Sequence, residues 1–283
     1  AFVVEPSPRG SGPAIGLAAS IIARRDPAAV MGSFAADHDV RDQSAFVRAI
    51  GVAIEAAREG WLVTVGLTPS RPETGYGYIE STDEAIAATE DGTAYRAARF
   101  VEKPDLARAS AYVASSRFLW NASMFVWSVG AFLAELQELQ PDLHAGLTRI
   151  ADAWDTPERA RVTAEVWPTL PETTIDEGVM ERSRRVAVVP ARMGWSDIGD
   201  WHGLGELLDH DQDGISGRGD LVHAGSRSSV VWSETGRLIA LVGLENVVVV
   251  DTPDALLVAD RARAQEVRGV VTRLKELRRT DML

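Results

Sequence analysis

Apolar residues gather in short runs over the first two hundred residues, and glycine, proline and charged residues separate the runs. Continuous apolar stretches predict buried strands, whereas apolar residues three and four apart predict helices with one buried face. By these criteria we expect strands at residues 2–4, 31–36, 61–67, 95–101 and 186–189, a mostly apolar run at 118–127, and helices at 14–23, 44–58, 129–140 and 151–165. Strands that alternate with helices in this way predict an α/β domain.

Local signals predict where two of these helices begin. Pro13 suits the first position of the helix at 14–23, because proline lacks the N–H that this position leaves unpaired. Ser44 suits the cap of the helix at 44–58, and Gly60 suits its end. One face of that helix is apolar, and we expect it to be buried. Its residues are Phe46, Val47, Ile50, Ile54 and Ala57.

The pattern changes after residue 209. Beyond a glycine-rich link at 213–219, four strand-like runs follow one another without helices between them, at 229–233, 237–242, 246–251 and 255–259. This spacing predicts a small all-β element, either a sandwich or stacked coils. A last helix at 260–279 carries Val267, Val270, Val271 and Leu274 on one stripe, so we expect it to pack on those strands. The predicted domains are therefore 1–209 and 210–283.

The composition argues against several classes of protein. The chain carries 29 basic and 41 acidic residues, so its net charge is −12, which disfavours nucleic acid or an anionic membrane as a partner. Cysteine is absent from the sequence, which rules out disulfides and thiolate metal sites and fits a reducing cytoplasm. The sequence shows neither a signal peptide nor an apolar stretch long enough to span a bilayer. We therefore expect a cytoplasmic protein.

Acidic residues stand at two expected strand ends, where ligands commonly bind in α/β sheets. Asp37 follows the strand at 31–36, and a carboxylate there can bind a hard cation such as Mg²⁺. Asp197 lies in the segment 194–201, which contains glycines and opens an expected helix. A solvated turn at Asp37 and a helix cap at Asp197 would explain the same residues.

Polar residues in four other stretches could also contact a ligand. The glycine-rich loop at 5–13 could hold an anion or simply connect two elements, and the glycines of the loop at 71–79 suit a sugar contact or a hairpin turn. Lys103 ends a strand and is a suitable point charge for a phosphate, although an exposed ion pair is the commoner role. Asn121 interrupts an apolar run and is either a hydrogen-bonding core residue or a ligand contact.

Seven stretches in a fixed order together resemble one family. They are Glu5-Pro6-x-x-Arg9 with Pro13-Ala14-Ile15, Ala36-Asp37-His38, Pro72-Glu73-Thr74-Gly75-Tyr76-Gly77-Tyr78-Ile79, Phe100-Val101-Glu102-Lys103-Pro104, Trp120-Asn121 with Met124-Phe125, Ile175-Asp176 with Val179-Met180-Glu181, and Gly194-Trp195-Ser196-Asp197-Ile198-Gly199. In this order they resemble the mannose-1-phosphate guanylyltransferases, or GDP-mannose pyrophosphorylases. The resemblance covers nearly the whole chain and implies a Rossmann-like nucleotidyltransferase domain followed by a short left-handed β-helix and a C-terminal helix.

The resemblance also implies an activity and a set of site residues. Members of the family join mannose 1-phosphate to GTP with Mg²⁺, giving GDP-mannose and pyrophosphate. By the match of motifs, Asp37 and Asp197 are the Mg²⁺ ligands, and Lys103 neutralises the sugar phosphate. The positions expected to bind substrate are Arg9, in the loop beside the guanine, together with Gly75, Glu102, Asn121, Asp176 and Gly199.

The sequence departs from the family pattern at two places. The family's Gly-Gly-x-Gly-Thr-Arg-Leu loop and the lysine after it are not found, and a start at Ala1 on an expected strand suggests that residues once preceded it. We therefore expect the chain as given to be a poor catalyst that binds GTP more weakly than mannose 1-phosphate. Ser123 stands where the family usually has glycine, so we expect it to crowd the sugar pocket.

Two other functions fit the same residues. One is a non-catalytic relative that serves regulation or subunit assembly, and the other is a transferase with a different base or sugar. An upstream glycine-rich loop would favour the enzyme over the first of these. Because an open stack of coils can be covered by another subunit, we also expect a homodimer formed by the C-terminal strands and the last helix.

Overall fold

The protein is described here by a computed structural model that covers residues 2–282 and contains two compact units. The first unit comprises residues 2–36 and 40–194, and the second comprises residues 37–39 and 195–282. Within each of these units, residues contact one another more than they contact the other unit. The boundary between family domains, expected between residues 209 and 210, stays a prediction.

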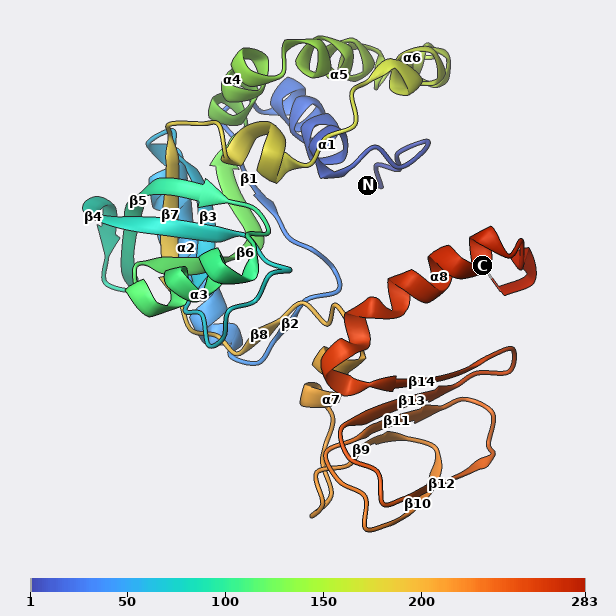
Figure 1. Ribbon diagram of the computed structural model, residues 1–283. Coiled ribbons are helices and arrows are strands. Elements are labelled where there is room, and N and C mark those ends of the chain that lie inside the picture. Colours follow the sequence, from blue (N-terminus) through green and yellow to red (C-terminus); the bar gives the residue numbers. More distant parts are fainter. Residues whose placement is uncertain (1, 283) are drawn as a thin grey trace. The chain divides into compact units, whose positions relative to one another are not determined.

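A six-stranded mixed sheet forms the centre of the first unit (Figure 1). Its strand order is β1-β6-β3-β7-β5-β4, and β4 also pairs with β6. The strands β3 and β7 run parallel, whereas the other neighbours are antiparallel. The strands are β1 (Val30–Ser33), β3 (Leu62–Leu67), β4 (Tyr78–Thr89), β5 (Gly92–Val101), β6 (Phe118–Ser128) and β7 (Val186–Ala191).

Helices cover both faces of this sheet because its central strands are apolar on both sides. Leu62 and Val188 face a core that includes residues of α1 (Ser11–Arg25), α4 (Val129–Leu139) and α5 (Pro141–Ala153). Val63 and Ala187, their neighbours along the chain, point the other way and meet α2 (Gln43–Arg58). The remaining helical segments of the unit are α3 (Leu106–Ser115), α6 (Arg159–Val166), η1 (Trp167–Thr169) and η2 (Asp176–Met180).

Parallel strands stacked in coils form most of the second unit. The pairing of Asp220 with Leu238 and of Val230 with Val248 shows that equivalent positions of successive coils lie 18 residues apart. The stacked-coil form of the expected β element is confirmed, and its left hand stays a prediction. The strands are β9 (Ser216–Arg218), β10 (Asp220–Ala224), β11 (Val230–Ser233), β12 (Leu238–Val242), β13 (Val247–Asp251) and β14 (Leu256–Asp260), which turns back antiparallel on β13.

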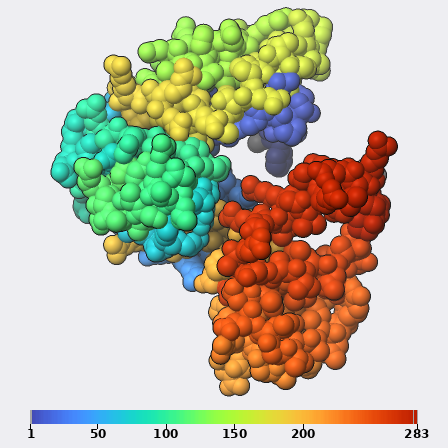
Figure 2. Space-filling view, in the orientation of Figure 1, coloured from blue at the N-terminus to red at the C-terminus, as the bar shows by residue number. Residues whose placement is uncertain are grey.

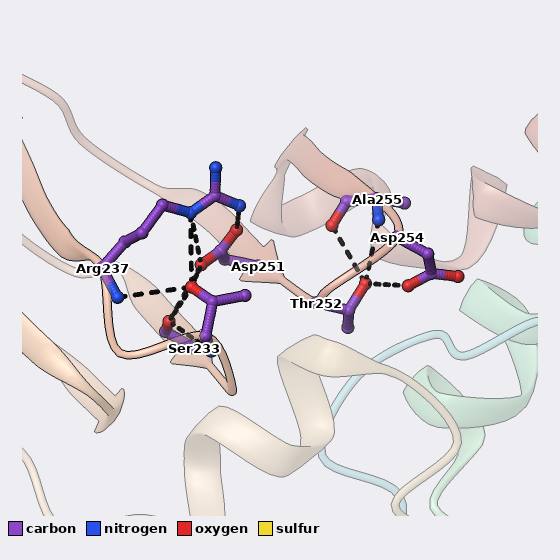
Figure 3. A network of polar contacts seen from close by, with 7 residues as sticks. Ser233, Arg237, Asp251, Thr252, Asp254 and Ala255 are labelled. Carbon is purple, nitrogen blue, oxygen red and sulfur yellow. Dashed lines mark hydrogen bonds and ion pairs between the residues drawn. The ribbon is translucent and has the colours of Figure 1, made fainter.

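At one corner of these coils, several polar side chains contact one buried carboxylate (Figure 3). Asp251 is 2% exposed, and it accepts hydrogen bonds from Ser233 Oγ at 3.0 Å and from the Thr235 hydroxyl. The Arg237 guanidinium forms an ion pair with the same carboxylate. These donors hold the pKa of Asp251 below its ordinary value, with the Thr235 hydrogen bond as the main cause.

Shorter elements complete the chain. They are β2 (Asp39–Val40), β8 (Trp195–Ser196), α7 (Trp201–Leu207), η3 (Arg261–Glu266), α8 (Val267–Glu276) and η4 (Thr280–Met282). In Figure 2 the C-terminal end of the chain, which includes α8, is drawn in red. Among residues 2–282, no helix has both the length and the apolar character needed to cross a bilayer.

The structure corrects two expectations near the N-terminus. Residues 2–4 form no strand, and Phe2 is 94% exposed, because no neighbouring strand is available to pair with this segment in the described structure. The first helix begins at Ser11, so Pro13 is its third residue. Proline fits there as well, because the N–H groups of a first helical turn have no partner within the helix.

The structure also corrects the expected cap of α2 and part of its expected buried face, of which Ala57 is buried and Ile50 and Ile54 pack against the core as expected. The cap is Asp42, whose carboxylate accepts the N–H of Ala45 at 2.9 Å. Val47 is 65% exposed, and the residues that α2 buries are mostly alanines, which allow the helix to lie close against the sheet. They are Ala49, Val52, Ala53, Ala56 and Ala57.

Two other helices differ from the sequence-based prediction. The helix expected at 151–165 is divided into α5 and α6, with Pro157 in the break, where proline disfavours a helical residue before it. The C-terminal helix is not continuous either, since η3 precedes α8 and contains a kink at Arg263. No residue of α8 is buried and Val270 is 52% exposed, so the expected packing of this helix on the strands is wrong.

Candidate active site

Glu102 and Lys103 follow the end of β5, as the sequence predicts. Lys103 Nζ lies 3.1 Å from Glu102 Oε1, and its backbone is in the left-handed region with φ 46°. The other carboxylate oxygen, Glu102 Oε2, is buried without a hydrogen-bond partner among the described residues. A Cβ on Gly77 would lie 2.5 Å from this oxygen, so a side chain there would displace the carboxylate. Glu102 therefore presents an acceptor that a ligand hydroxyl could satisfy.

Asn121 on β6 links two other predicted site positions. Its backbone N–H donates to the carbonyl of Gly77 at 2.8 Å, and its side-chain Nδ2 donates to Asp176 Oδ1 at 2.9 Å. Its Oδ1 accepts the Thr64 hydroxyl at 2.9 Å, which fixes the orientation of the amide. Asn121 thus holds the first residue of η2, Asp176, beside the sheet.

The pKa of Asp176 reflects its burial and, to a smaller extent, a neighbouring carboxylate. Burial raises the pKa of Asp176 to about 6, and the nearby Glu102 carboxylate contributes to the rise. The Asn121 hydrogen bond and the Lys103 charge act in the opposite direction. The first unit therefore brings together four residues proposed from the sequence, two acids, one amide and one cation.

The loop that carries Gly75 is braced by an acid that sequence reasoning did not select. Glu73 Oε1 accepts the backbone N–H of Gly75 at 3.0 Å, and Glu73 also pairs with Arg71 at 3.0 Å. The Arg71 guanidinium lies 5.6 Å from the ring centre of Trp120, next to Asn121 in sequence. An acid two residues before a glycine in a turn was the signal that could have found Glu73.

Ser123, two residues after Asn121, has the backbone conformation of a glycine. Its φ is 51°, and its side chain is exposed. The backbone N–H of Ser123 donates to Asn121 Oδ1 at 3.1 Å, so this turn helps to hold the amide. The departure from the family pattern therefore falls at a strained position beside the site.

The second unit contains both predicted Mg²⁺ ligands, and His38 links them. The carboxylates of Asp37 and Asp197 both act electrostatically to raise the pKa of His38, although burial outweighs them and lowers it. Trp195 Nε1–H donates to His38 Nδ1 at 3.2 Å, and the two rings meet edge to face. Both carboxylates therefore lie within electrostatic range of the same imidazole.

Carboxylates are ligands that a magnesium ion prefers. Mg²⁺ usually binds one or two protein carboxylates and takes its other ligands from water and substrate phosphates. Within residues 2–282, His, Asp and Glu form no group of three or more that could hold a metal, so Asp37 and Asp197 would be the protein's share. Gly199 shapes the second of these positions, since its N–H donates to Asp197 Oδ1 at 3.3 Å.

Arg9 has structural partners in the first unit. Its guanidinium donates to the carbonyl oxygens of Pro168 and Leu170, both at 2.6 Å, and lies 3.6 Å from the Glu172 carboxylate. Arg9 therefore holds the segment that follows α6. Its expected contact with substrate stays a prediction.

Comparisons with known proteins agree with this fold. The model of the nucleotidyl transferase family matches residues 1–214, and that of the MannoseP isomerase/GMP-like β-helix domain matches residues 219–274. The crystal structure of mannose-1-phosphate geranyltransferase from Thermus thermophilus aligns with 96% of this chain and 77% of its own, with a TM-score of 0.83 and 33% identity. The chain belongs to the nucleotidyl transferase family.

Curated relatives indicate to which group within the nucleotidyl transferases the chain is similar. The mannose-1-phosphate guanylyltransferase of Escherichia coli (strain K12) is 41% identical over 97% of this chain and 58% of its own length. The xanthan biosynthesis protein XanB of Xanthomonas campestris (strain B100) is 39% identical over 99% of this chain and 58% of its own. Within the nucleotidyl transferases, the chain is thus a member of the mannose-1-phosphate guanylyltransferase family, and it spans less than two thirds of the length of these relatives.

Proposed function

We propose that the protein transfers GMP from GTP to mannose 1-phosphate, giving GDP-mannose and pyrophosphate. The observation that carries this proposal is the cluster of Glu102, Lys103, Asn121 and Asp176, which combines hydroxyl acceptors with a cation. Such a cluster is suited to a sugar that carries a phosphate. Membership of the guanylyltransferase family supports the choice of mannose and guanine.

The carboxylates would hold and orient the sugar. Glu102 Oε2 is already desolvated without a donor, so a sugar hydroxyl that donates to it restores a hydrogen bond at small further cost. Asp176, fixed by Asn121, would accept a second hydroxyl in its ionised form, which predominates above its pKa of about 6. Two fixed acceptors would orient the ring and with it the phosphate.

Lys103 would hold the phosphate of the sugar. An oxygen of this phosphate attacks the α-phosphorus of GTP, a P–O bond forms, and the bond to the β-phosphate bridging oxygen breaks with release of pyrophosphate. The protein's contribution to such a transfer is positioning and charge neutralisation. A magnesium ion held by Asp37 and Asp197 would add positive charge beside the triphosphate.

The test is formation of GDP-mannose by the protein that carries this sequence, followed by chromatography and by pyrophosphate release. Asp37→Asn and Asp197→Asn should each leave less than about a tenth of the rate at saturating Mg²⁺, with the fold intact by circular dichroism. Asp209→Asn, an exposed acid, is the matched control. Full activity of either ligand variant would remove its metal role, and preference for another base or sugar would change the proposed substrates.

A further inference from the structure

The segment that carries Asp197 is folded onto α7 in the second unit. Asp200 caps this helix, with its Oδ1 accepting the N–H of Gly203 at 2.8 Å and its carbonyl accepting that of Leu204 at 3.0 Å. A Cβ on Gly203 would lie 3.6 Å from the Cα of Ile198, so the turn passes close to the first helical residues. A movement of α7 would therefore move the turn that holds the Asp197 carboxylate.

The helix α7 is in turn packed onto the coils. Trp201, its first residue, belongs to the apolar cluster of Val230 and Val248, and its ring lies 6.1 Å from that of Trp232. Gly205 approaches β11 so closely that a Cβ would lie 2.3 Å from Val230 Cγ2. The coils thus provide the surface on which α7 rests.

A buried arginine from η3 joins α7 to the coils on the polar side. The Arg261 side chain is 8% exposed, forms an ion pair with Glu206 of α7 and donates to the carbonyl of Ser228 at 3.4 Å. Glu206 is itself 59% exposed. Because a buried guanidinium without its partner is costly, this pair holds α7 in one position more strictly than an exposed pair would.

The other side of α7 is not filled. An open pocket of about 350 Å³ is lined by Ile198, Gly199 and Trp201 and also by residues of η3 and α8, including Ala264. Open space on this side cannot hold the turn in place. The turn is therefore connected to the coils through the contacts of Trp201, Gly205 and Arg261.

We infer that Arg261 is a positioning residue, through which the β-helix holds the Asp197 carboxylate in place for the metal of the nucleotidyl transfer. The inference rests on the proposed function for the role of Asp197. It gives the β-helix a part in the chemistry that is separate from any part in assembly.

The test compares three variants with the wild-type protein. Arg261→Met keeps the length of the side chain without its charge, Arg261→Lys keeps the charge, and Glu206→Gln weakens the pair from its exposed side. The matched control is Arg263→Met, because Arg263 belongs to the same short helix but pairs on the surface with Glu266. Mn²⁺ binding is measured by electron paramagnetic resonance, mannose 1-phosphate binding by calorimetry, and turnover against Mg²⁺ concentration.

We expect Arg261→Met and Glu206→Gln to weaken Mn²⁺ binding at least fivefold and to raise the Mg²⁺ concentration for half-maximal rate. Mannose 1-phosphate binding should stay within twofold, Arg261→Lys should recover part of the loss, and Arg263→Met should behave as wild type. Unchanged Mn²⁺ binding in folded Arg261→Met and Glu206→Gln would overturn the inference, as would equal loss of metal and sugar-phosphate binding. Wild-type protein that binds Mn²⁺ at Asp197 but forms no sugar nucleotide would overturn only the proposed function.

Discussion

In the proposed site, individual side chains would serve two purposes, contact with substrate and support of those contacts. Glu102 and Lys103 are proposed to contact substrate, whereas Asn121, Glu73 and Gly77 fix the surroundings of these groups. The motifs of the sequence contained both kinds without distinguishing them. The distinction came from hydrogen-bond partners, which depend on residues far apart in the chain.

At Lys103 we predict a selective loss of binding. Lys103→Ala should weaken mannose 1-phosphate more than tenfold and GTP much less, because a charge-assisted phosphate contact contributes roughly 1.5–3 kcal/mol. Calorimetric titration with each substrate measures the difference. Lys275→Ala, which removes an exposed lysine on α8, should change neither affinity. Equal weakening of both substrates would indicate a folding defect instead.

At Asp176 we predict a pH-dependent stability penalty. Its folded pKa of about 6 lies above the ordinary 3.8, so the contribution of this group to stability is most favourable below pH 3.8 and is lost as pH rises through 6. The full penalty is about 3 kcal/mol, of which roughly 1–1.5 kcal/mol develops between about pH 5 and 7.5. Over that range Asp176→Asn should gain stability relative to wild type in urea unfolding. Parallel pH profiles would contradict the buried, ionisable state of Asp176.

At Ser123 we predict that substitution by glycine gives a more stable protein than substitution by alanine. Both substitutions remove the hydroxyl, but only alanine keeps a Cβ at φ 51°, so Ser123→Gly should be more stable than Ser123→Ala by about 1 kcal/mol. The order should reverse at Ser110, in the exposed middle of α3, where alanine is the better helix former. Chemical denaturation of the four variants measures both differences. The same order at both positions would contradict a strained Ser123.

Among the elements, the prediction from sequence was correct where the local pattern is compatible with only one kind of secondary structure. The apolar runs that became β3, β6 and β7 are buried because they are central in the sheet, and the four runs expected in the C-terminal part became β11 to β14. It was wrong where the position of a segment in the fold determines whether the segment forms a strand. The strands β9 and β10 were missed, since the glycine-rich link that contains β9 becomes a strand only when β11 lies beside it.

The corner of the coils at Asp251 gives a prediction for this element. Asp251→Asn should lower the melting temperature near pH 7, because it weakens the acceptor for Thr235 and Arg237. The pKa of Asp251 is depressed, so its stabilisation is present above the unfolded value of 3.8 and is lost as pH falls through the lower folded value. The difference from wild type in thermal melts should therefore shrink below about pH 4. Asp209→Asn, an exposed acid outside this corner, is the control, and a difference that persists in acid would contradict the role.

For the whole molecule, the homodimer and the cytoplasmic location remain predictions. The exposed apolar residues of α8 give the dimer a concrete test. If this helix is part of the subunit interface, Val270→Glu should lower the particle mass found by light scattering to that of one chain, because it places a charge in an apolar contact. Arg273→Glu, a charge change elsewhere on the same helix, should not. A wild-type mass of one chain at all concentrations would remove the dimer prediction.

The sequence by itself determined the α/β class, the stacked strands of the C-terminal part and the family, because these depend on local patterns and on motifs in a fixed order. Only the tertiary structure decided which site residues meet. Asn121 and Asp176 are 55 residues apart and are joined by one hydrogen bond, while Glu206 and Arg261 are also 55 apart and are joined by one ion pair. The burial that raises the pKa of Asp176 and the packing that leaves α8 exposed arise from the folded arrangement of distant segments, which no local pattern specifies.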